Sequence, residues 1–326
     1  MPNASTTPPS VDPLVRPFPA GGSCRIVVAA NPISGRGRGV AVAESTAAAL
    51  TAAGHRPQIV PTQLGPSADW LDPTLREADL LVVVGGDGAM RMAAAAAIRC
   101  GTPVHHLPLG TENLFAREFG SRPDPEQLIE RLAAGVVRRV DVGTAGDETF
   151  LLMASIGFDA EVVHDLAARR RGAITHWSYA GPILRRAVRW RAPRVSIDVD
   201  GVSVARGVRG SAIVANCRQY GGRLDPLPNA EMDDGALGVV LLPARGAFGA
   251  ARGAAACRMR RSHRLRGAII ARGQRIRVAC DPPSRLQLDG DPAGDAESRV
   301  AELACTVCPG VLPVLAGARP AVPAVR

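Results

Sequence analysis

An apolar run, a cluster of glycines and a second apolar run organise the first half of the chain. Leu80–Val84 is short and rich in β-branched residues, which is typical of a buried strand, and Ala89–Ile98 predicts a helix. Between them lies Gly85-Gly86-Asp87-Gly88. Unpaired N–H groups and the helix dipole make such a turn suited to phosphate oxygens, with a divalent cation between them and Asp87. An ordinary turn in which Asp87 caps a helix remains an alternative.

Strand and helix patterns alternate through residues 24–135. Further strands are expected at residues 24–30, 56–61 and 104–109, and helices at 40–53, 89–100 and 124–134. This alternation predicts an α/β region, a Rossmann-like parallel sheet with helices on both faces. Ligands of such sheets bind at the carboxyl ends of the strands, where the Gly-rich loops fall.

From about residue 136 the pattern changes to short β-branched runs separated by Gly and Pro. We expect strands at residues 136–142, 149–155, 194–199, 202–207, 211–215, 238–242, 267–270, 275–280 and 285–288. These predict a mainly antiparallel β region, interrupted by one helical segment at residues 159–191. Residues 1–23 are rich in Pro, Ser and Thr and lack a long apolar run, so we expect a disordered leader and not a signal peptide.

Composition narrows the chemistry. The chain has 326 residues and a net charge of +9, and all 39 of its basic residues are arginine. The absence of lysine excludes Schiff-base chemistry and a Walker A lysine. Aromatic residues make up 3%, too few for base-stacking platforms, so we expect no nucleic-acid partner. The seven scattered cysteines predict reduced core thiols, and the lone pair Cys305 and Cys308 is a weak metal or redox candidate.

Taken together, the loops resemble the diacylglycerol kinase catalytic-domain family, which includes bacterial lipid kinases and the sphingosine kinases. The blocks occur in the family's order over residues 24–316: NPISGRG (31–37), GGDG (85–88), PLGTENLFARE (108–118), SIGFDAEV (155–162), NCRQYGGRLDPLPNAEMDDGALGVVLL (216–242) and LQLDGD (286–291). The resemblance implies a nucleotide-binding domain at 24–135, a lipid-binding β-sandwich at 136–305, and a return strand with a tail at 306–326. It also implies transfer of phosphate from ATP, with Mg²⁺, to a lipid hydroxyl in the cleft between the domains.

The resemblance assigns roles to individual residues. Those expected to contact nucleotide are Asn31, Ser34, Gly35, Thr62, Gly85, Gly86, Asp87, Gly88, Gly110, Thr111 and Asn113. Asp291 is the expected proton acceptor for the lipid hydroxyl, with Asp289 beside it and Asp87 as the third catalytic carboxylate. Asp234, with the carbonyls of Glu231 and Ala236, resembles a structural Mg²⁺ site of some bacterial members, although a plain turn fits as well. The Asp289–Asp291 stretch could also be an ordinary solvated turn.

Three positions depart from the family's pattern. Asp291 stands where Glu is usual, Ala89 where Thr is usual, and Arg91 where Asn is common. Ala89 removes one hydroxyl from the turn and Asp291 is shorter by one methylene, so both put turnover in doubt more than fold. For Arg91 we favour a solvated position on the helix over a phosphate ligand.

The segment 169–194 is rich in arginine and carries Trp177, Tyr179 and Trp190, which suits a helix lying on an anionic bilayer. Packing against the core is the alternative. We therefore expect a cytoplasmic protein, peripheral at the inner membrane face, with a lipid substrate, and leave a homodimer open. The favoured function is ATP-dependent phosphorylation of diacylglycerol to phosphatidic acid. A sphingoid-base or ceramide kinase, an NAD kinase-like enzyme and a catalytically weak lipid- or nucleotide-binding regulator remain alternatives.

Overall fold

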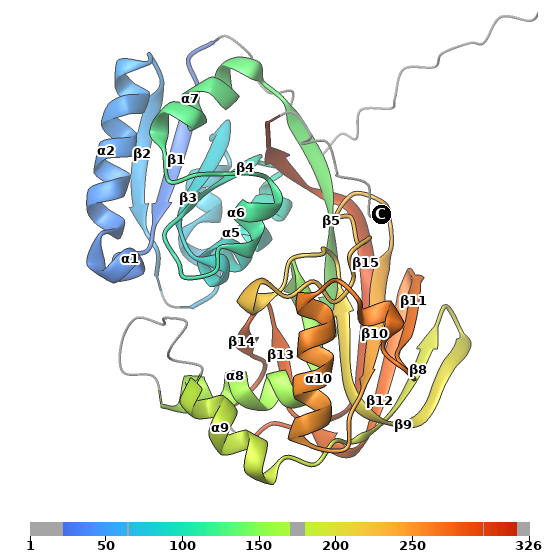
Figure 1. Cartoon of the computed structure of the whole chain (residues 1–326). Coiled ribbons are helices and arrows are strands. Elements are labelled where there is room, and N and C mark those ends of the chain that lie inside the picture. The colour runs from blue at the N-terminus through green and yellow to red at the C-terminus, as the bar shows by residue number, and fades with distance from the viewer. Residues whose placement is uncertain (1–21, 64, 170–179, 296, 318–326) are drawn as a thin grey trace, which may run out of the picture.

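The computed structural model describes residues 22–63, 65–169, 180–295 and 297–317. The expected leader at 1–23 and the tail after 317 lie almost entirely outside them. Figure 1 shows an N-terminal lobe of strands flanked by helices and a C-terminal lobe dominated by strands. Two long strands, β5 and β15, run from one lobe into the other.

A parallel sheet forms the centre of the N-terminal lobe. Its strands are β1 (Arg25–Ala30), β2 (Arg56–Pro61), β3 (Leu80–Gly85) and β4 (Val104–Pro108), in the order β4-β3-β1-β2. All three pairings between them are parallel, so their carboxyl ends lie at one edge. This arrangement confirms the α/β prediction, and the expected strands agree with the observed ones to within a residue.

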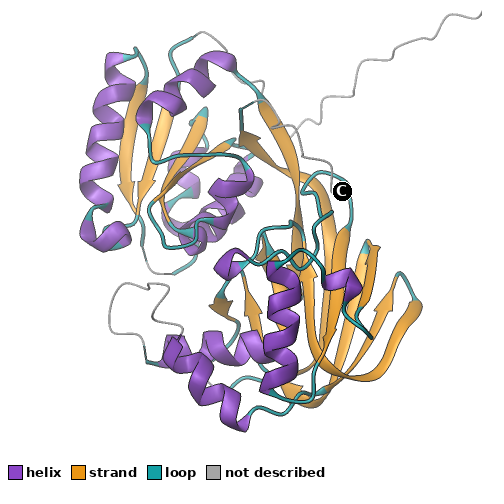
Figure 2. Ribbon diagram, viewed as in Figure 1, coloured by secondary structure: helices purple, strands orange, loops and turns teal. Residues whose placement is uncertain are grey.

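Helices cover both faces of this sheet (Figure 2). They are α1 (Ser34–Gly37), α2 (Gly39–Ala52), α3 (Ser67–Trp70), α4 (Asp72–Leu75), α5 (Asp87–Cys100), α6 (Leu114–Glu118) and α7 (Pro125–Ala134). Ile26 and Val28 of β1 pack with Leu50 of α2 on one face, whereas Val27 and Ala29 pack toward α4 and α5 on the other. The strictly alternating side chains of a strand thus feed two separate cores.

The C-terminal lobe is a β-sandwich, as predicted. Its strands are β5 (Val137–Ala145), β6 (Glu148–Phe150), β7 (Met153–Ile156), β8 (Arg194–Val199), β9 (Val202–Ala215), β10 (Leu237–Pro243), β11 (Ile269–Gly273), β12 (Arg275–Ser284), β13 (Leu286–Leu288), β14 (Asp291–Pro292) and β15 (Val300–Leu315). Val195 and Ile197 of one sheet meet Val239 and Leu241 of the other in a buried apolar core. The pairings within this lobe are antiparallel.

Several strands of this lobe differ from the prediction, and the single strand expected at 149–155 forms the two strands β6 and β7. The stretches expected at 202–207 and 211–215 form the single strand β9, which pairs with β8 through its first half and with β7 and β10 through its second. Gly207 interrupts it with a φ of 59°, which explains why the sequence looked like two strands. β15 begins at Val300, earlier than the return strand expected from residue 306, and pairs with β12, β5 and β4 in turn.

The helices of this lobe are α8 (Phe158–Ala168), α9 (Ala180–Arg189) and α10 (Ala247–Arg258), with short 3₁₀ turns at Gly221–Arg223 and Ser262–Arg264. The expected helical segment 159–191 contains α8 and α9, and residues 170–179 between them lie outside the described residues. The sequence analysis missed α10, because its two glycines weaken a helical pattern. One of them, Gly249, packs so closely on Ala244 that a Cβ would lie 2.8 Å from the Ala244 Cα.

Candidate active site

Three loops of the N-terminal lobe meet at the carboxyl edge of the parallel sheet. The loop after β1 approaches the turn after β3, because a Cβ on Gly85 would lie 3.6 Å from the Ser34 Oγ and 3.9 Å from the Asn31 Cβ. The loop after β4 lies on the other side, and a Cβ on Gly86 would be 3.3 Å from the Gly110 Cα. A Cβ at Gly85 would make ordinary contacts with the first loop, whereas a Cβ at Gly86 would be tight against the loop after β4. The structure therefore brings the predicted phosphate-binding segments together.

The first loop owes its shape to a few hydrogen bonds. The Asn31 side chain accepts the backbone N–H of Ile33 at 3.1 Å, and the Asn31 backbone N–H donates to the Val84 carbonyl. Gly35 and Arg36 both have positive φ values, 59° and 61°, so α1 is kinked and not a regular helix. Ser34 is thereby held beside the Gly85 turn.

Asp87 holds a neighbouring helix in place. Its two carboxylate oxygens accept the backbone N–H groups of Leu114 and Phe115, each at 3.0 Å. Asn113, just before α6, has a φ of 49° and makes no capping bond with its side chain, so Asp87 caps this helix from a distance. The alternative left open by the sequence, a capping role, is thus present, but the helix capped is α6 and not α5.

The loop after β4 is also internally bonded. The Asn113 side chain accepts the Gly110 N–H and donates to the Gly110 carbonyl, both at 2.7 Å. Both ends of its amide are therefore used within the loop. We infer that Asn113 shapes this loop, a role that does not need direct contact with nucleotide.

A buried histidine supports the turn from below. His106 of β4 is 1% exposed, and its Nε2 lies 3.0 Å from the Gly85 carbonyl, to which it donates as the neutral tautomer. Burial lowers the pKa of His106. The sequence analysis missed this residue, although two adjacent histidines, His105 and His106, inside a strand were the available signal.

The second acidic turn comes from the C-terminal lobe. Asp289, between β13 and β14, is 7% exposed, and its carboxylate accepts the backbone N–H groups of Leu151, Leu152 and Met153 at 2.7–2.9 Å. Burial raises the pKa of Asp289 to about 6, against the opposing effects of these donors and of Arg91. Asp289 therefore fastens the turn to the start of β7.

Asp291 has a different environment. Its side chain is 46% exposed, and its Oδ2 lies 3.0 Å from the position that a Cβ on Gly88 would occupy. The Arg91 guanidinium lies 3.9 Å from the same oxygen. The structure thus brings a carboxylate that lies about two hundred residues downstream against the Gly85–Gly88 turn. Arg91 points toward this contact, so the solvated position favoured from the sequence is wrong.

A buried hydrogen-bond chain stands behind the second turn. The Gly290 N–H donates to the Gln287 side chain, which in turn donates to the Ser155 hydroxyl, both at 2.7 Å. The hydroxyls of Ser155 and Tyr220 both donate to the same oxygen of Asp159. Burial and the neighbouring Asp159 raise the pKa of Tyr220. This chain links two of the sequence blocks, at 155–162 and 216–242, to the Asp289–Asp291 turn.

Of the remaining predicted residues, Thr62 lies at the same carboxyl edge of the sheet and Asp234 lies in a turn of the C-terminal lobe. Thr62 follows β2, where its N–H bonds to the Ala30 carbonyl. Asp234 forms an ion pair with Arg272 and accepts the Ala236 N–H, a plain turn with a cation already on the carboxylate. These contacts do not fit a bound Mg²⁺. Across the described ranges, no cluster of three or more His, Cys, Asp or Glu side chains could hold a metal ion.

The two clustered cysteines also do not fit a metal or redox site. Cys305 and Cys308 lie three residues apart on β15, so their side chains point to opposite sides of the strand. Burial raises the pKa of Cys305 to about 12, which keeps its thiol protonated and unreactive.

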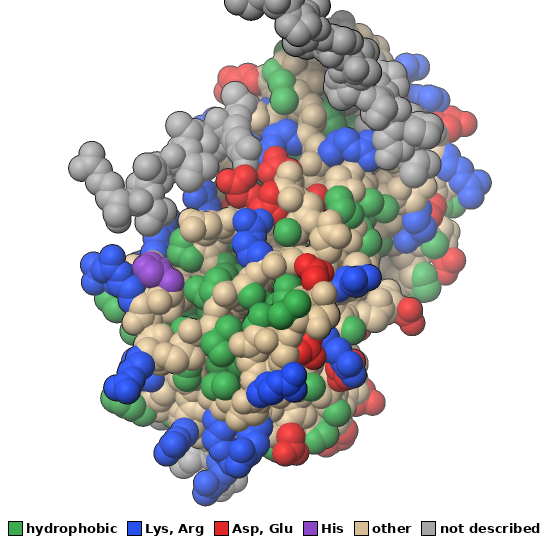
Figure 3. Space-filling model, turned by 90° about the vertical axis from the view of Figure 1, so that its right-hand side faces the viewer, with side chains coloured by type: hydrophobic (Ala, Val, Ile, Leu, Met, Phe, Trp, Pro, Cys, Tyr) green, Lys and Arg blue, Asp and Glu red, His purple; other side chains and the backbone are tan. Residues whose placement is uncertain are grey.

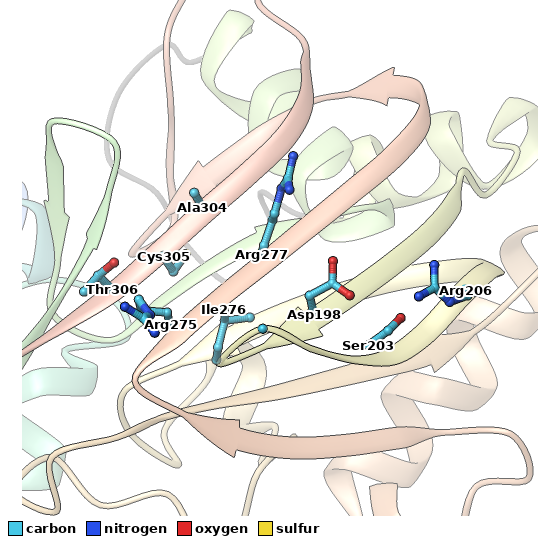
Figure 4. Close-up of a pocket in the computed structure, with 10 residues that line it drawn as sticks. Asp198, Ser203, Arg206, Arg275, Ile276, Arg277, Ala304, Cys305 and Thr306 are labelled. Atoms are coloured by element: carbon cyan, nitrogen blue, oxygen red, sulfur yellow. The ribbon is translucent and has the colours of Figure 1, made fainter.

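A pocket of about 430 Å³ lies elsewhere, on strands of the sandwich (Figure 4). Arg206, Arg275 and Arg277 line it together with Asp198. None of the residues predicted for the site is among its lining residues. On the face shown in Figure 3, arginine side chains are scattered among acidic and apolar ones. The positive charge of the chain is not gathered into one patch on this face.

Part of the segment expected to lie on a membrane makes contacts within the protein. Arg185 and Arg186 of α9 pair with Asp165 of α8, and the Trp190 ring meets the Phe158 ring edge to face at 5.2 Å. Trp177 and Tyr179 lie outside the described residues. Within the described part of the chain, no helix is both long and apolar enough to cross a bilayer.

Fold and site together define a two-lobed protein of the lipid kinase type, with a glycine-rich turn on one lobe and an acidic turn on the other. The family model "Diacylglycerol kinase catalytic domain" matches residues 25–145, and "YegS C-terminal NAD kinase beta sandwich-like domain" matches residues 153–316. The chain belongs to the diacylglycerol kinase and YegS-like lipid kinase family.

Individual relatives agree with this assignment. A "Diacylglycerol kinase" of Mycobacterium tuberculosis is 29% identical over 67% of this chain and 72% of its own length. A "Probable lipid kinase YegS-like" of Pseudomonas putida is 32% identical over 50% of this chain and 56% of its own length. A crystal structure of a diacylglycerol kinase from Bacillus anthracis superposes with a TM-score of 0.66 at 18% identity, covering 91% of this chain and 97% of that one, and so supports the fold.

Proposed function

We propose that this chain transfers the γ-phosphate of ATP to the hydroxyl of a lipid, with diacylglycerol as the acceptor and phosphatidic acid as the product. The observation that carries the proposal is the position of the Asp291 carboxylate against Gly88. It places an acid that can accept a proton next to a turn suited to phosphates. Both parts of a phosphoryl-transfer site are thereby within reach of one substrate pair.

The Gly85–Gly88 turn would hold the phosphates. It lies at the start of α5, a helix of 14 residues, whose first N–H groups have no partner within the helix. Asn31 and Ser34 lie beside the turn, where their side chains can donate hydrogen bonds to phosphate oxygens or hold other polar groups in place. Mg²⁺ would enter with ATP, held mainly by the nucleotide's own phosphates, and would neutralise their charge.

Asp291 would accept the proton of the lipid hydroxyl. The O–H bond breaks as the hydroxyl oxygen bonds to the γ-phosphorus, and the bond from that phosphorus to the β-phosphate oxygen breaks, with ADP leaving with the electron pair. The Asp291 side chain is 46% exposed and can reach a substrate. Asp289 is only 7% exposed, and the carboxylate of Asp87 holds the start of α6. We therefore assign proton transfer to Asp291, and positioning to Asp289 and Asp87.

The choice of diacylglycerol rests on the names of the relatives. Proteins called diacylglycerol kinase from Mycobacterium tuberculosis and Bacillus subtilis cover about two thirds of this chain. They do not favour the NAD kinase-like enzyme or the regulator. A sphingoid-base or ceramide acceptor stays as an outcome of the test below.

A lipid acceptor requires contact with a membrane, which we propose at the end of the C-terminal lobe that carries α9 and α10. Ile183 is 45% exposed and Phe248 is 87% exposed there, on helices whose sequences also contain arginines. Such a combination suits peripheral attachment to an anionic surface. The expected result is co-sedimentation with anionic vesicles that Phe248→Ser weakens and that neutral vesicles do not reproduce.

The test of the reaction is transfer of labelled γ-phosphate from MgATP to diacylglycerol, sphingosine and ceramide in mixed micelles. We expect labelled phosphatidic acid, and none from Asp291→Asn. Asp295→Asn is the matched control, because Asp295 is a fully exposed acid of the same hairpin region. Label on sphingosine or ceramide alone would replace the acceptor, and no labelled lipid with ATP still bound would overturn the kinase proposal.

A further inference from the structure

Arg91 stands at the meeting point of the two lobes. It lies on α5, four residues after Asp87, and its side chain is 20% exposed. Its guanidinium lies 3.9 Å from the Asp291 Oδ2 and 3.7 Å from the Glu148 Oε2 of β6. Three elements far apart in the sequence thus converge on one cation.

Helical geometry explains why Arg91 can act on Asp291. Positions three apart share one face of a helix, so Gly88 and Arg91 face the second lobe together. Gly88 lets the carboxylate approach, since a Cβ there would lie only 3.0 Å from the Asp291 Oδ2, and Arg91 supplies positive charge on the same face. Gly88 and Arg91 together position the Asp291 carboxylate.

The charges around Arg91 are unbalanced. Asp291 faces it from the start of β14, Asp289 from the turn before β14, and Glu148 from β6. Arg91 also favours the charged form of the buried Asp289, lowering its pKa against the effect of burial. An acid that must accept a proton is of use only while it is charged, and a cation within about 4–6 Å favours that form.

We propose that Arg91 is a positioning residue for phosphoryl transfer, which keeps the Asp291 carboxylate charged and in place against Gly88. Glu148 weakens this interaction by competing for the same guanidinium. The role rests on the proposed function of Asp291. It differs from that of a phosphate ligand, because Arg91 acts through Asp291 and not on ATP.

The pH dependence of kcat/KM for lipid phosphorylation separates these roles. Removing the cation in Arg91→Met should shift the acidic limb upward by about 0.5 to 1 pH unit, giving a loss of about three- to tenfold at pH values below the limb and little loss on the plateau above it. Arg91→Lys should restore most of the wild-type profile. Glu148→Gln should shift the limb the opposite way, because it frees Arg91 for Asp291.

Arg99→Met is the matched control, on the same helix. Arg99 binds Asp72 through two hydrogen bonds of 2.8 Å, away from the second lobe, so its loss should lower thermal stability without moving the pH profile. Parallel profiles for wild type and Arg91→Met would overturn the proposal. A pH-independent rise in the KM for ATP would overturn it as well, in favour of a phosphate ligand.

A second readout does not depend on activity. The titration of the Asp291 carboxyl, followed by ¹³C NMR and assigned with Asp291→Asn, should have a higher midpoint in Arg91→Met than in wild type. If no lipid is phosphorylated but this shift is present, the proposed function fails and the coupling of Arg91 to Asp291 stands. An unchanged midpoint contradicts the coupling itself.

Discussion

The two acidic turns that meet between the lobes use their carboxylates differently. In the Gly85–Gly88 turn, Asp87 is bound to the N–H groups of Leu114 and Phe115. In the Asp289–Asp291 turn, Asp289 is bound to three N–H groups, while Asp291 is half exposed and faces Gly88. Only the second turn therefore combines a carboxylate that builds the fold with one that can meet a substrate.

This difference shows that the spacing of two carboxylates along the sequence does not by itself determine the chemical role of each. Asp289 and Asp291 are two residues apart and identical in type, yet Asp289 is 7% exposed and the Asp291 side chain is 46% exposed. A carboxylate that satisfies several buried N–H groups is costly to remove, because each donor left without a partner loses about 1–3 kcal/mol. Stability and activity measurements on the same variants should separate the two roles.

The largest effect is expected for Asp291→Asn. Loss of a proton acceptor should lower kcat by about 10²- to 10⁴-fold while the melting temperature stays within about 2 °C of wild type. Transfer of labelled phosphate and calorimetry check the two halves. A variant that keeps near-wild-type turnover would remove Asp291 from the chemistry.

Asp289→Asn should act mainly on stability. The amide can still accept hydrogen bonds at one oxygen, but its NH₂ group would face the Leu151 N–H or the other two donors, costing about 1–3 kcal/mol in the free energy of unfolding. Urea denaturation measures this cost. Asp200→Asn, at a loop where Asp200 also accepts two backbone N–H groups, is the control for an equivalent loss outside the site, with activity unaffected.

For the same variant, Asp289→Asn, we expect the difference in stability from wild type to depend on pH. The pKa of Asp289 is raised from 3.8 to about 6 in the folded protein. Between these values the unfolded chain loses the proton first, so this carboxyl stabilises the fold at low pH and that contribution is lost as pH rises toward 6. The stability advantage of wild type over Asp289→Asn should therefore shrink by about 2 kcal/mol from pH 4 to pH 7, and an advantage that grows would contradict the shift.

Asp87→Asn should have a smaller effect. One of the two donors at the start of α6 would meet an NH₂ group, at a cost of about 1 kcal/mol, and the amides of residues 114–118 should exchange faster. Asp124→Asn is the control, because Asp124 caps α7 through one oxygen and Asn caps equally well. Unchanged exchange at α6 would mean that Asp87 does not hold it.

The smallest effect is expected for Asp234→Ala. It removes an ion pair with Arg272 whose side chains are 46% and 21% exposed, worth about 0–1 kcal/mol. The Mg²⁺ concentration needed for half-maximal activity should not change. A higher requirement would restore the structural Mg²⁺ site that the sequence had suggested for Asp234.

Much of the fold follows from the sequence, because its signals are local. The buried run Leu80–Val84 and the glycines after it predict β3, the turn and α5 almost to the residue. β9 was divided in two, since Gly207 breaks the strand pattern while pairing with neighbouring strands preserves it. The helix α10 was missed because its glycines weaken a helical pattern, and the close packing of Gly249 on Ala244, just after β10, is not recorded in any local pattern.

For the candidate site, the sequence predicted which segments are involved better than it predicted the role of each residue. Sequence blocks located both acidic turns, but they could not show that Asp87 caps α6 or that Asp289 is buried. These facts depend on contacts between segments far apart in the chain. The surroundings of Arg91 likewise depend on tertiary contacts. The helix fixes only the face on which Arg91 lies, and β6 and β14 supply the carboxylates opposite it.

The most direct test of the central claim is a crystal structure with a non-hydrolysable ATP analogue and Mg²⁺. The account predicts the γ-phosphate over the Gly85–Gly88 turn, with the Asp291 carboxylate within about 5 Å of it, close enough to reach an attacking hydroxyl. A γ-phosphate bound away from this turn, or on its far side from Asp291, would contradict the claim that the two turns form one site.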